Sequence, residues 1–155
     1  MKPIWFLIAI AYILVIFIAL PFVFVSLNVS LSLPVLDNTV VKSTGLVLGV
    51  IGILVATHSY ILFPKIGKGS PIPTNPAKIL IERGLYQYSR NPIYISHLLL
   101  IFAGTFFLGY TTLFAYTFLC FIGYNWYITY IEEPELKKRF GNSYSEYCKR
   151  VPRWL

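Results

Sequence analysis

Four long runs of apolar residues limit what this chain can fold into. They are IWFLIAIAYILVIFIALPFVFVSL, STGLVLGVIGILVATHSYILF, IYISHLLLIFAGTFFLGY and TTLFAYTFLCFIGYNWYITYI. A helix needs about 20 apolar residues to cross a bilayer, and this sequence is 57% hydrophobic and only 12% charged. We therefore predict an all-α integral membrane protein in which the whole chain, 1–155, forms a single membrane domain. Its four transmembrane helices are expected at about 4–27, 44–63, 93–110 and 112–131.

Basic residues are concentrated in two of the segments that flank these runs. The net charge is +7, and most of it lies in the connection 64–92 and in the tail 132–155. The positive-inside rule places both segments in the cytoplasm. We expect this charge to reflect topology and attraction to anionic headgroups, not nucleic acid. The short chain and the lack of an organelle address favour a prokaryotic plasma membrane.

The spacing of small residues and turns predicts how the helices meet. Runs three and four adjoin at Tyr110 and Thr111 with almost no loop, which predicts a tight antiparallel hairpin. Small residues form one stripe on the second run, which allows another helix to approach closely. We expect that partner to be a helix of the same chain. The stripe consists of Gly45, Gly49, Gly52 and Ala56.

Shorter elements are predicted in the two cytoplasmic segments, where we expect amphipathic helices. NPAKILIERG is typical of a short helix at the membrane surface, with Asn75 as its N-cap. GLYQYSRNP is expected to be extended, because the residue before a proline avoids the helical region. In the tail, Pro134 is suited to open a helix that Glu133 caps and Gly141 ends. NSYSEYCKR is expected to form a second tail helix.

Two adjacent carboxylates stand where a helix disfavours them. Glu132 and Glu133 are placed at the C-terminal end of the fourth run, where the helix dipole is negative. The predicted hairpin would bring them near Arg90, Asn91 and Tyr94 in one cytoplasmic cleft. Carboxylates accept hydrogen bonds and attract cations. A nucleoside-like ligand with hydroxyl groups and a positive centre would suit this cleft.

Two motifs that bracket the hairpin identify a family. GLYQYSRNPIY followed by EEPELKKRFGNSYSEYCKRVPRWL resembles the membrane methyltransferases, which are the isoprenylcysteine carboxyl methyltransferases and the phospholipid N-methyltransferases. The matched pattern is G-x-Y-x-x-x-R-[NH]-P-x-Y and then E-E-x-x-L-x-x-x-F-G-x-x-Y-x-x-Y-x-x-x-V-P. The resemblance covers roughly residues 78–154.

The resemblance implies S-adenosylmethionine as the methyl donor and a lipophilic acceptor that enters from the bilayer. It also implies a cofactor site formed by Leu80, Ile81, Tyr86, Arg90, Asn91, Pro92, Tyr94, Glu132 and Glu133. An amine acceptor must lose a proton, for which Glu132 and His97 are the candidate catalytic residues. Prenylcysteine enzymes often carry an arginine just before the acidic pair, whereas NWYITYI has no basic residue there. The E-E-P sequence favours the phospholipid branch, and a carboxylate, an amine or a thiol stays open as the acceptor.

Two other classes of function are compatible with parts of the sequence. Membrane steroid reductases that use NADPH share an arginine-proline-tyrosine stretch before a hairpin. A small four-span transporter would need an ionisable group within the bilayer, for which only His58 and His97 are available. A metal site is not expected, since Cys120 and Cys148 lack the spacing of metal ligands.

Overall fold

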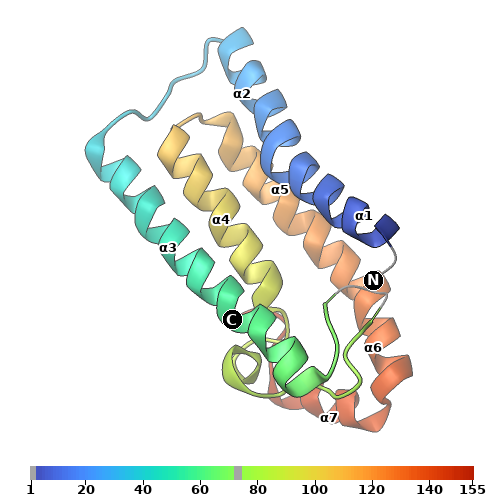
Figure 1. The fold of residues 1–155 in the computed structure, drawn as a ribbon. Helices are drawn as coiled ribbons and strands as arrows, with labels where there is room; N and C mark the ends of the chain where they lie inside the picture. Colours follow the sequence, from blue (N-terminus) through green and yellow to red (C-terminus); the bar gives the residue numbers. More distant parts are fainter. Residues whose placement is uncertain (1–2, 72–74) are drawn as a thin grey trace.

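The computed structural model describes residues 3–71 and 75–155, and these residues form helices and connections with no named strand. The first helix consists of α1 (Pro3–Leu14), a π-helical segment η1 (Val15–Ala19) and α2 (Leu20–Ser30). The second consists of α3 (Thr39–Leu62) and the π-helical η2 (Phe63–Gly67). Residues 109–111 join α4 (Pro92–Leu108) to α5 (Thr112–Tyr127). In Figure 1, α4 lies between α3 and α5, and α1 and α2 run along the other side of α5.

The all-helical prediction is confirmed for the described residues, and the apolar helices agree with a membrane protein. Two stretches are long and apolar enough to cross a bilayer, Leu7–Ser30 and Thr39–Gly67. Pro92–Leu108 is a shorter apolar helix. The prediction of four spans therefore remains a prediction, although helices exist at all four expected positions.

The small-residue stripe packs α3 against α4, as the sequence predicts. A Cβ atom added at Gly45 would lie 2.7 Å from the backbone nitrogen of Phe107 and 2.8 Å from the carbonyl oxygen of Ala103. One added at Gly52 would lie 3.1 Å from the side chain of Leu100. The backbones of α3 and α4 thus approach so closely that only glycine fits at Gly45. This contact fixes α4 beside α3 along the stretch from Gly45 to Gly52.

One buried asparagine fastens α2 to the α4–α5 turn. Asn28 is 1% exposed, and its Oδ1 accepts hydrogen bonds from the Thr111 hydroxyl and the Thr112 backbone N–H. Its Nδ2 donates to the carbonyl of Leu33. Both the oxygen and the nitrogen of this amide have hydrogen-bond partners, so the first helix is held to the rest of the bundle at this end.

The helix predicted within residues 75–83 is wrong. This segment folds back on η2 instead: the backbone N–H groups of Lys78 and Ile79 both donate to the carbonyl of Gly67. Gly69 packs so tightly on Pro76 that a Cβ atom would lie 2.5 Å from the Pro76 carbonyl oxygen. Tertiary contact with η2 therefore overrides the local helical signal. The predicted extended stretch is also partly wrong, since η3 (Gly84–Gln87) is a 3-10 turn.

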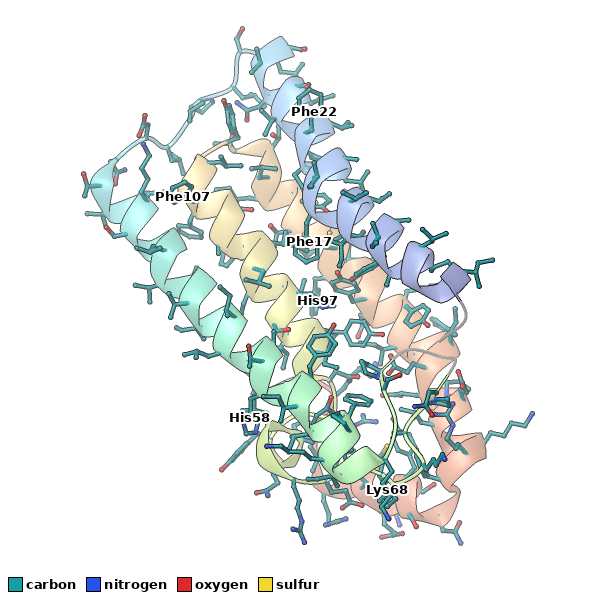
Figure 2. The ribbon with its side chains drawn as sticks, in the orientation of Figure 1. Phe17, Phe22, His58, Lys68, His97 and Phe107 are labelled. Atoms are coloured by element: carbon teal, nitrogen blue, oxygen red, sulfur yellow. The ribbon has the colours of Figure 1, made fainter. Side chains whose placement is uncertain are left out.

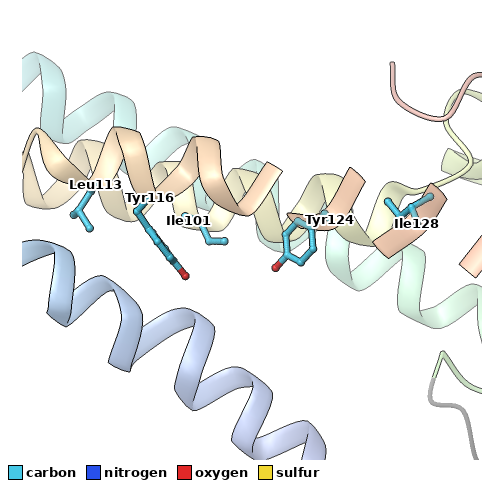
Figure 3. Packing of buried hydrophobic residues seen from close by; sticks show 5 residues of the cluster. All are labelled: Ile101, Leu113, Tyr116, Tyr124 and Ile128. Atoms are coloured by element: carbon cyan, nitrogen blue, oxygen red, sulfur yellow. The ribbon is translucent and has the colours of Figure 1, made fainter. Parts of the chain in front are cut away.

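The tail forms the two predicted helices, α6 (Glu133–Phe140) and α7 (Asn142–Arg150), which are separated at Gly141. Their inner faces meet in a small core of Tyr144, Tyr147 and Val151. A larger core lies between α4, α5 and the first helix (Figure 3), and it contains Ile101, Leu113, Tyr116, Tyr124 and Ile128.

Candidate functional site

The acidic pair does not stand at the end of a helix. A π-helical segment, η4 (Ile128–Glu132), joins α5 directly to α6, so the chain is helical without a break from Thr112 to Phe140. Glu132 and Glu133 both have right-handed helical backbone angles. The expectation that Glu133 caps a new helix is therefore wrong, and the helix-end dipole does not act on the pair. Single π turns inside α-helices occur frequently at functional sites.

Glu132 points toward α4 and is largely buried. The Tyr94 hydroxyl donates a 2.6 Å hydrogen bond to its Oε2. Burial raises the pKa of the Glu132 carboxyl above its ordinary value, and the hydrogen bond from Tyr94 opposes this shift. Among the described residues, no ion pair involves Glu132. A sheltered carboxylate without a cation is costly unless a ligand supplies one.

Glu133 is engaged entirely by arginines. Its Oε1 lies 2.8 Å from Arg90 Nη1, and Arg153 donates to both of its oxygens at 2.8 Å each. Such bidentate guanidinium pairs are among the stronger protein hydrogen bonds. The bond to Glu133 is also the main cause of the raised pKa of Arg153. The predicted cofactor ligand Glu133 thus has its acceptor sites occupied by side chains of the same chain.

The Arg-Asn-Pro segment forms a buried turn that starts α4. Asn91 donates from its side-chain amide to the carbonyl of Arg153, and its backbone N–H donates to the Ser89 hydroxyl. Pro92 is the first residue of α4 and is buried. Arg90 Nη1 also contacts Cys148 Sγ at 2.8 Å. These residues hold the start of α4 in place, and Tyr94 follows within the first turn of the helix.

The remaining predicted cofactor residues lie on the connection below α3. Tyr86 is buried, its ring packs edge-on against Phe63, and burial raises the pKa of its phenol, with the charge of Glu132 as a second cause. Ile81 is buried, whereas Leu80 packs against the tail core. Tyr86 is therefore near Glu132 and stays a neutral hydroxyl donor, while Leu80 faces a different part of the molecule.

His97 lies in the middle of the bundle (Figure 2), with the edge of Phe17 against its ring. Its Nδ1 is 3.2 Å from the Tyr12 hydroxyl, and its Nε2 is 3.3 Å from the Tyr60 hydroxyl. Tyr12 in turn lies 2.7 Å from the hydroxyl of Tyr124. The structure thus places His97 in a hydroxyl cluster one turn further along α4 than Tyr94, and no hydrogen bond between described residues joins it to Glu132.

Several residues near the site are not predicted from the sequence. Tyr12 and Tyr60 are far from the motifs in sequence, and only the packing of α1 and α3 on α4 brings them to His97. Arg153 lies in the V-P-R-W end of the recognised motif, and this position could have marked it as a candidate site residue. Nothing in the sequence indicates that it pairs with Glu133. His58 lies against the Gly84 turn, where a Cβ atom would come within 2.4 Å of its Nε2.

A pocket of about 480 Å³ opens beside the acidic pair, on the side of Glu133. Its lining residues are Arg90, Thr129, Glu133, Pro134, Lys137, Tyr144, Ser145 and Cys148. Residues of α6 and α7 form most of the lining of the pocket, which contains more cationic than anionic side chains. Within the described part of the chain, no cluster of three histidine, cysteine, aspartate or glutamate residues could hold a metal ion.

Comparison with known proteins identifies the family. A family model described as phospholipid methyltransferase matches residues 40–143. The chain belongs to this family. The match begins in α3, so it extends further toward the N-terminus than the motifs that the sequence analysis recognised. Neither the curated proteins nor the solved structures yield a match.

Proposed function

We propose that this protein is an S-adenosylmethionine-dependent methyltransferase that acts on a lipid or lipophilic acceptor at the cytoplasmic face of a membrane. Membership in the phospholipid methyltransferase family implies methyl transfer in a membrane setting. The observation that carries the choice of donor is Glu132, a sheltered carboxylate whose hydrogen-bond partner is a tyrosine and not a cation. A ligand with positive charge and hydroxyl groups would complete this site.

The residues around Glu132 fit such a donor. S-adenosylmethionine carries a sulfonium and an amino group, and when bound it supplies an electrophilic methyl group. Glu132 would accept hydrogen bonds from its amino group or ribose hydroxyls, with Tyr94 and Tyr86 as neighbouring donors. Arg90, Asn91, Pro92 and Ile81 would shape the surrounding wall, whereas Leu80, whose side chain packs against the tail core, would contribute only its backbone. Glu133 fits this role less well than expected, because two arginines already occupy its oxygens.

The chain's own contribution to the reaction is mainly positional. Holding donor and acceptor in the reactive geometry can remove roughly 7–11 kcal/mol of the barrier. An amine attacks the methyl group only in its neutral form, so an amine that arrives protonated must first give its proton to an acceptor at the site. Glu132 would take this role at the donor site, whereas His97 would act only on an acceptor that reaches the hydroxyl cluster.

The proposed topology places this site at the cytoplasmic surface. Four spans at about 4–27, 44–63, 93–110 and 112–131 leave both basic segments on the same side, as the positive-inside rule requires. Glu132 then lies just beyond the fourth span. A lipid acceptor would enter from the bilayer and the soluble donor from the cytosol, so the two substrates meet where α4 begins and α5 ends.

Ligand-dependent thermal stability of the detergent-purified protein tests the donor. A ligand that binds only the folded state stabilises it by about 2.7 kcal/mol at one hundred times its Kd. We expect stabilisation by S-adenosylhomocysteine and none by NADPH. Stabilisation by NADPH alone would move the assignment to a reductase. Transfer of labelled methyl groups from S-adenosylmethionine to a lipid extract then identifies the acceptor class, and proton-coupled uptake by vesicles without any cofactor binding would instead indicate a transporter.

A further inference from the structure

The residues that follow α7 return to the start of α4 and bond to its backbone turn. The carbonyl of Pro152 accepts from the Arg90 backbone N–H at 3.0 Å. The carbonyl of Arg153 accepts two hydrogen bonds of 3.0 Å, one from the Ser89 hydroxyl and one from the Asn91 amide. The turn before α4 therefore uses the C-terminal segment as its hydrogen-bonding partner.

The side chains of the same segment reach α5 and α6, on the other side of the site from the turn before α4. The Arg153 guanidinium donates one hydrogen bond of 2.8 Å to each carboxylate oxygen of Glu133, which is the first residue of α6 after the η4 turn. The indole N–H of Trp154 donates to Asn125 Oδ1 in α5 at 3.1 Å. The Trp154 ring also packs on Phe121, with 5.2 Å between ring centroids. One short segment thus bonds through its backbone to the turn before α4, and through its side chains to α5 and α6.

We propose that residues 152–154 form a tail clamp that holds the start of α4 against the η4 turn, and that Arg153 is a positioning residue for the Glu132–Tyr94 pair. This inference rests on the proposed function, because it assigns the clamp to the donor site. Glu133 is then the anchor of the clamp, and Glu132 alone of the two carboxylates is left for the donor.

The clamp and the donor site lie between the same two elements, the start of α4 and the junction of η4 with α6. Tyr94 follows the clamped turn in the first turn of α4, and Glu132 directly precedes the clamped Glu133. The hydrogen bond between Tyr94 and Glu132 crosses the gap that the clamp also crosses. Release of Arg153 would let these two elements separate and would move both donor-site residues, although Arg153 itself touches neither.

The clamp differs from the ordinary ion pairs of the tail in its burial. The side chains of Arg153 and Glu133 are 28% and 19% exposed, whereas Lys149 and Glu146 in the neighbouring α7 pair are 70% and 63% exposed. Exposed pairs contribute little to structure. Lys149→Ala is therefore a matched control: it removes one tail cation and one ion pair and leaves the clamp intact.

The first measurement is the affinity of the purified full-length protein for S-adenosylhomocysteine, by calorimetry. We expect Arg153→Ala to weaken binding by about tenfold or more, because a charged bidentate pair is lost. Arg153→Lys keeps the charge but not the planar fork, so it should recover part of the affinity. Lys149→Ala should bind like the wild type. If Arg153→Ala does not fold, Arg153→Lys compared with Lys149→Ala is judged by the same criterion.

The second measurement separates positioning from a general loss of structure. In a background that carries Trp5→Phe and Trp126→Phe, Trp154 is the remaining tryptophan and reports docking of the tail through its emission. Arg153→Ala should shift this emission to the red. Because coupling between two binding events is reciprocal, saturating S-adenosylhomocysteine should shift the emission of Arg153→Ala back toward the wild-type value.

The outcomes are distinguishable. Equal affinity for S-adenosylhomocysteine in Arg153→Ala and the wild type, with a released tail, overturns the clamp and leaves the proposed function standing. A red shift that the ligand does not reverse also overturns it. Failure of the wild type to bind S-adenosylhomocysteine overturns the proposed function and the clamp together.

Discussion

The substitution Glu132→Gln gives the sharpest test of the donor site, because it removes the carboxylate charge and keeps the size of the side chain. The Tyr94 hydroxyl still has an oxygen to donate to. Two effects of opposite sign are expected. The affinity for S-adenosylhomocysteine should fall, because its cationic amino group loses a carboxylate, and the ligand-free protein should become more stable, because a sheltered charge without a cation has been removed.

The size of the first effect follows from the kind of contact that is lost. Hydrogen bonds to a charged partner contribute about 1.5–3 kcal/mol. At about 1.4 kcal/mol for each tenfold change, the Kd for S-adenosylhomocysteine should rise by roughly 10- to 150-fold. A smaller change would mean that Glu132 does not contact the ligand.

The second effect depends on pH. The pKa of Glu132 is raised above its ordinary value of 4.5 in the folded protein, mainly by burial. The folded state therefore holds this proton more tightly than the unfolded state. The resulting stability is fully present below the ordinary value and is lost as the pH rises through the raised pKa. The ligand-free wild type should lose stability in that window, and Glu132→Gln should not lose it from this position.

Calorimetry with S-adenosylhomocysteine and thermal unfolding of the ligand-free protein measure both effects in the same preparations, the unfolding over a pH series that starts below the ordinary carboxyl value of 4.5. For the stability effect, Glu133→Gln is the matched control, since it changes the adjacent carboxylate in the same way. It should destabilise the protein by about 1–3 kcal/mol, because Arg90 and Arg153 lose their anionic partner. If Glu132→Gln destabilised the ligand-free protein while its affinity stayed unchanged, Glu132 would be structural and the reasoning refuted.

Three further perturbations test the packing and the deeper histidine. Gly45→Ala should destabilise the protein in detergent unfolding by about 1–3 kcal/mol, because its Cβ atom would meet backbone atoms of α4, whereas Gly49→Ala, with its nearest neighbour at 3.6 Å, should be tolerated. Asn28→Ala should cost about 1–3 kcal/mol in the same assay, because it removes the buried amide that accepts from the Thr111 hydroxyl and the Thr112 backbone N–H. His97→Gln should leave the affinity for S-adenosylhomocysteine unchanged, and full methyl transfer by this variant would exclude His97 as the proton acceptor.

The sequence predicts the helices well where hydrophobicity alone decides them. The apolar runs coincide with α1–α2, α3, α4 and α5, and the stripe of small residues correctly places α3 against another helix of the chain. The segment around Lys78 is different. Its cap and its apolar residues are typical of a helix, but the free carbonyl of Gly67 at the end of η2 offers a hydrogen-bond acceptor from outside the segment. A contact of this kind is not visible in a local pattern.

The sequence predicts one contact near the acidic pair correctly, but it does not predict the other partners of the residues there. Tyr94 and Glu132 meet as expected, because each lies at a predicted end of a helix in the same motif pair. The hydroxyl cluster around His97 depends on side chains from α1 and α3, and their register against α4 is a property of packing. Neither Tyr12 nor Tyr60 carries a local signal that distinguishes it from an interfacial tyrosine.

The acidic pair shows why adjacency in sequence is a poor guide to a shared role. Successive residues of an α-helix point about 100° apart, since a turn contains about 3.6 residues. With no break between α5 and α6, Glu132 and Glu133 must therefore face different surroundings. One meets a tyrosine of α4 and the other meets two arginines. A second carboxylate neutralised by arginines costs the fold little and anchors the tail. The first is sheltered and bonds to a tyrosine instead of forming an ion pair, and a cationic donor would offset the cost of burying it.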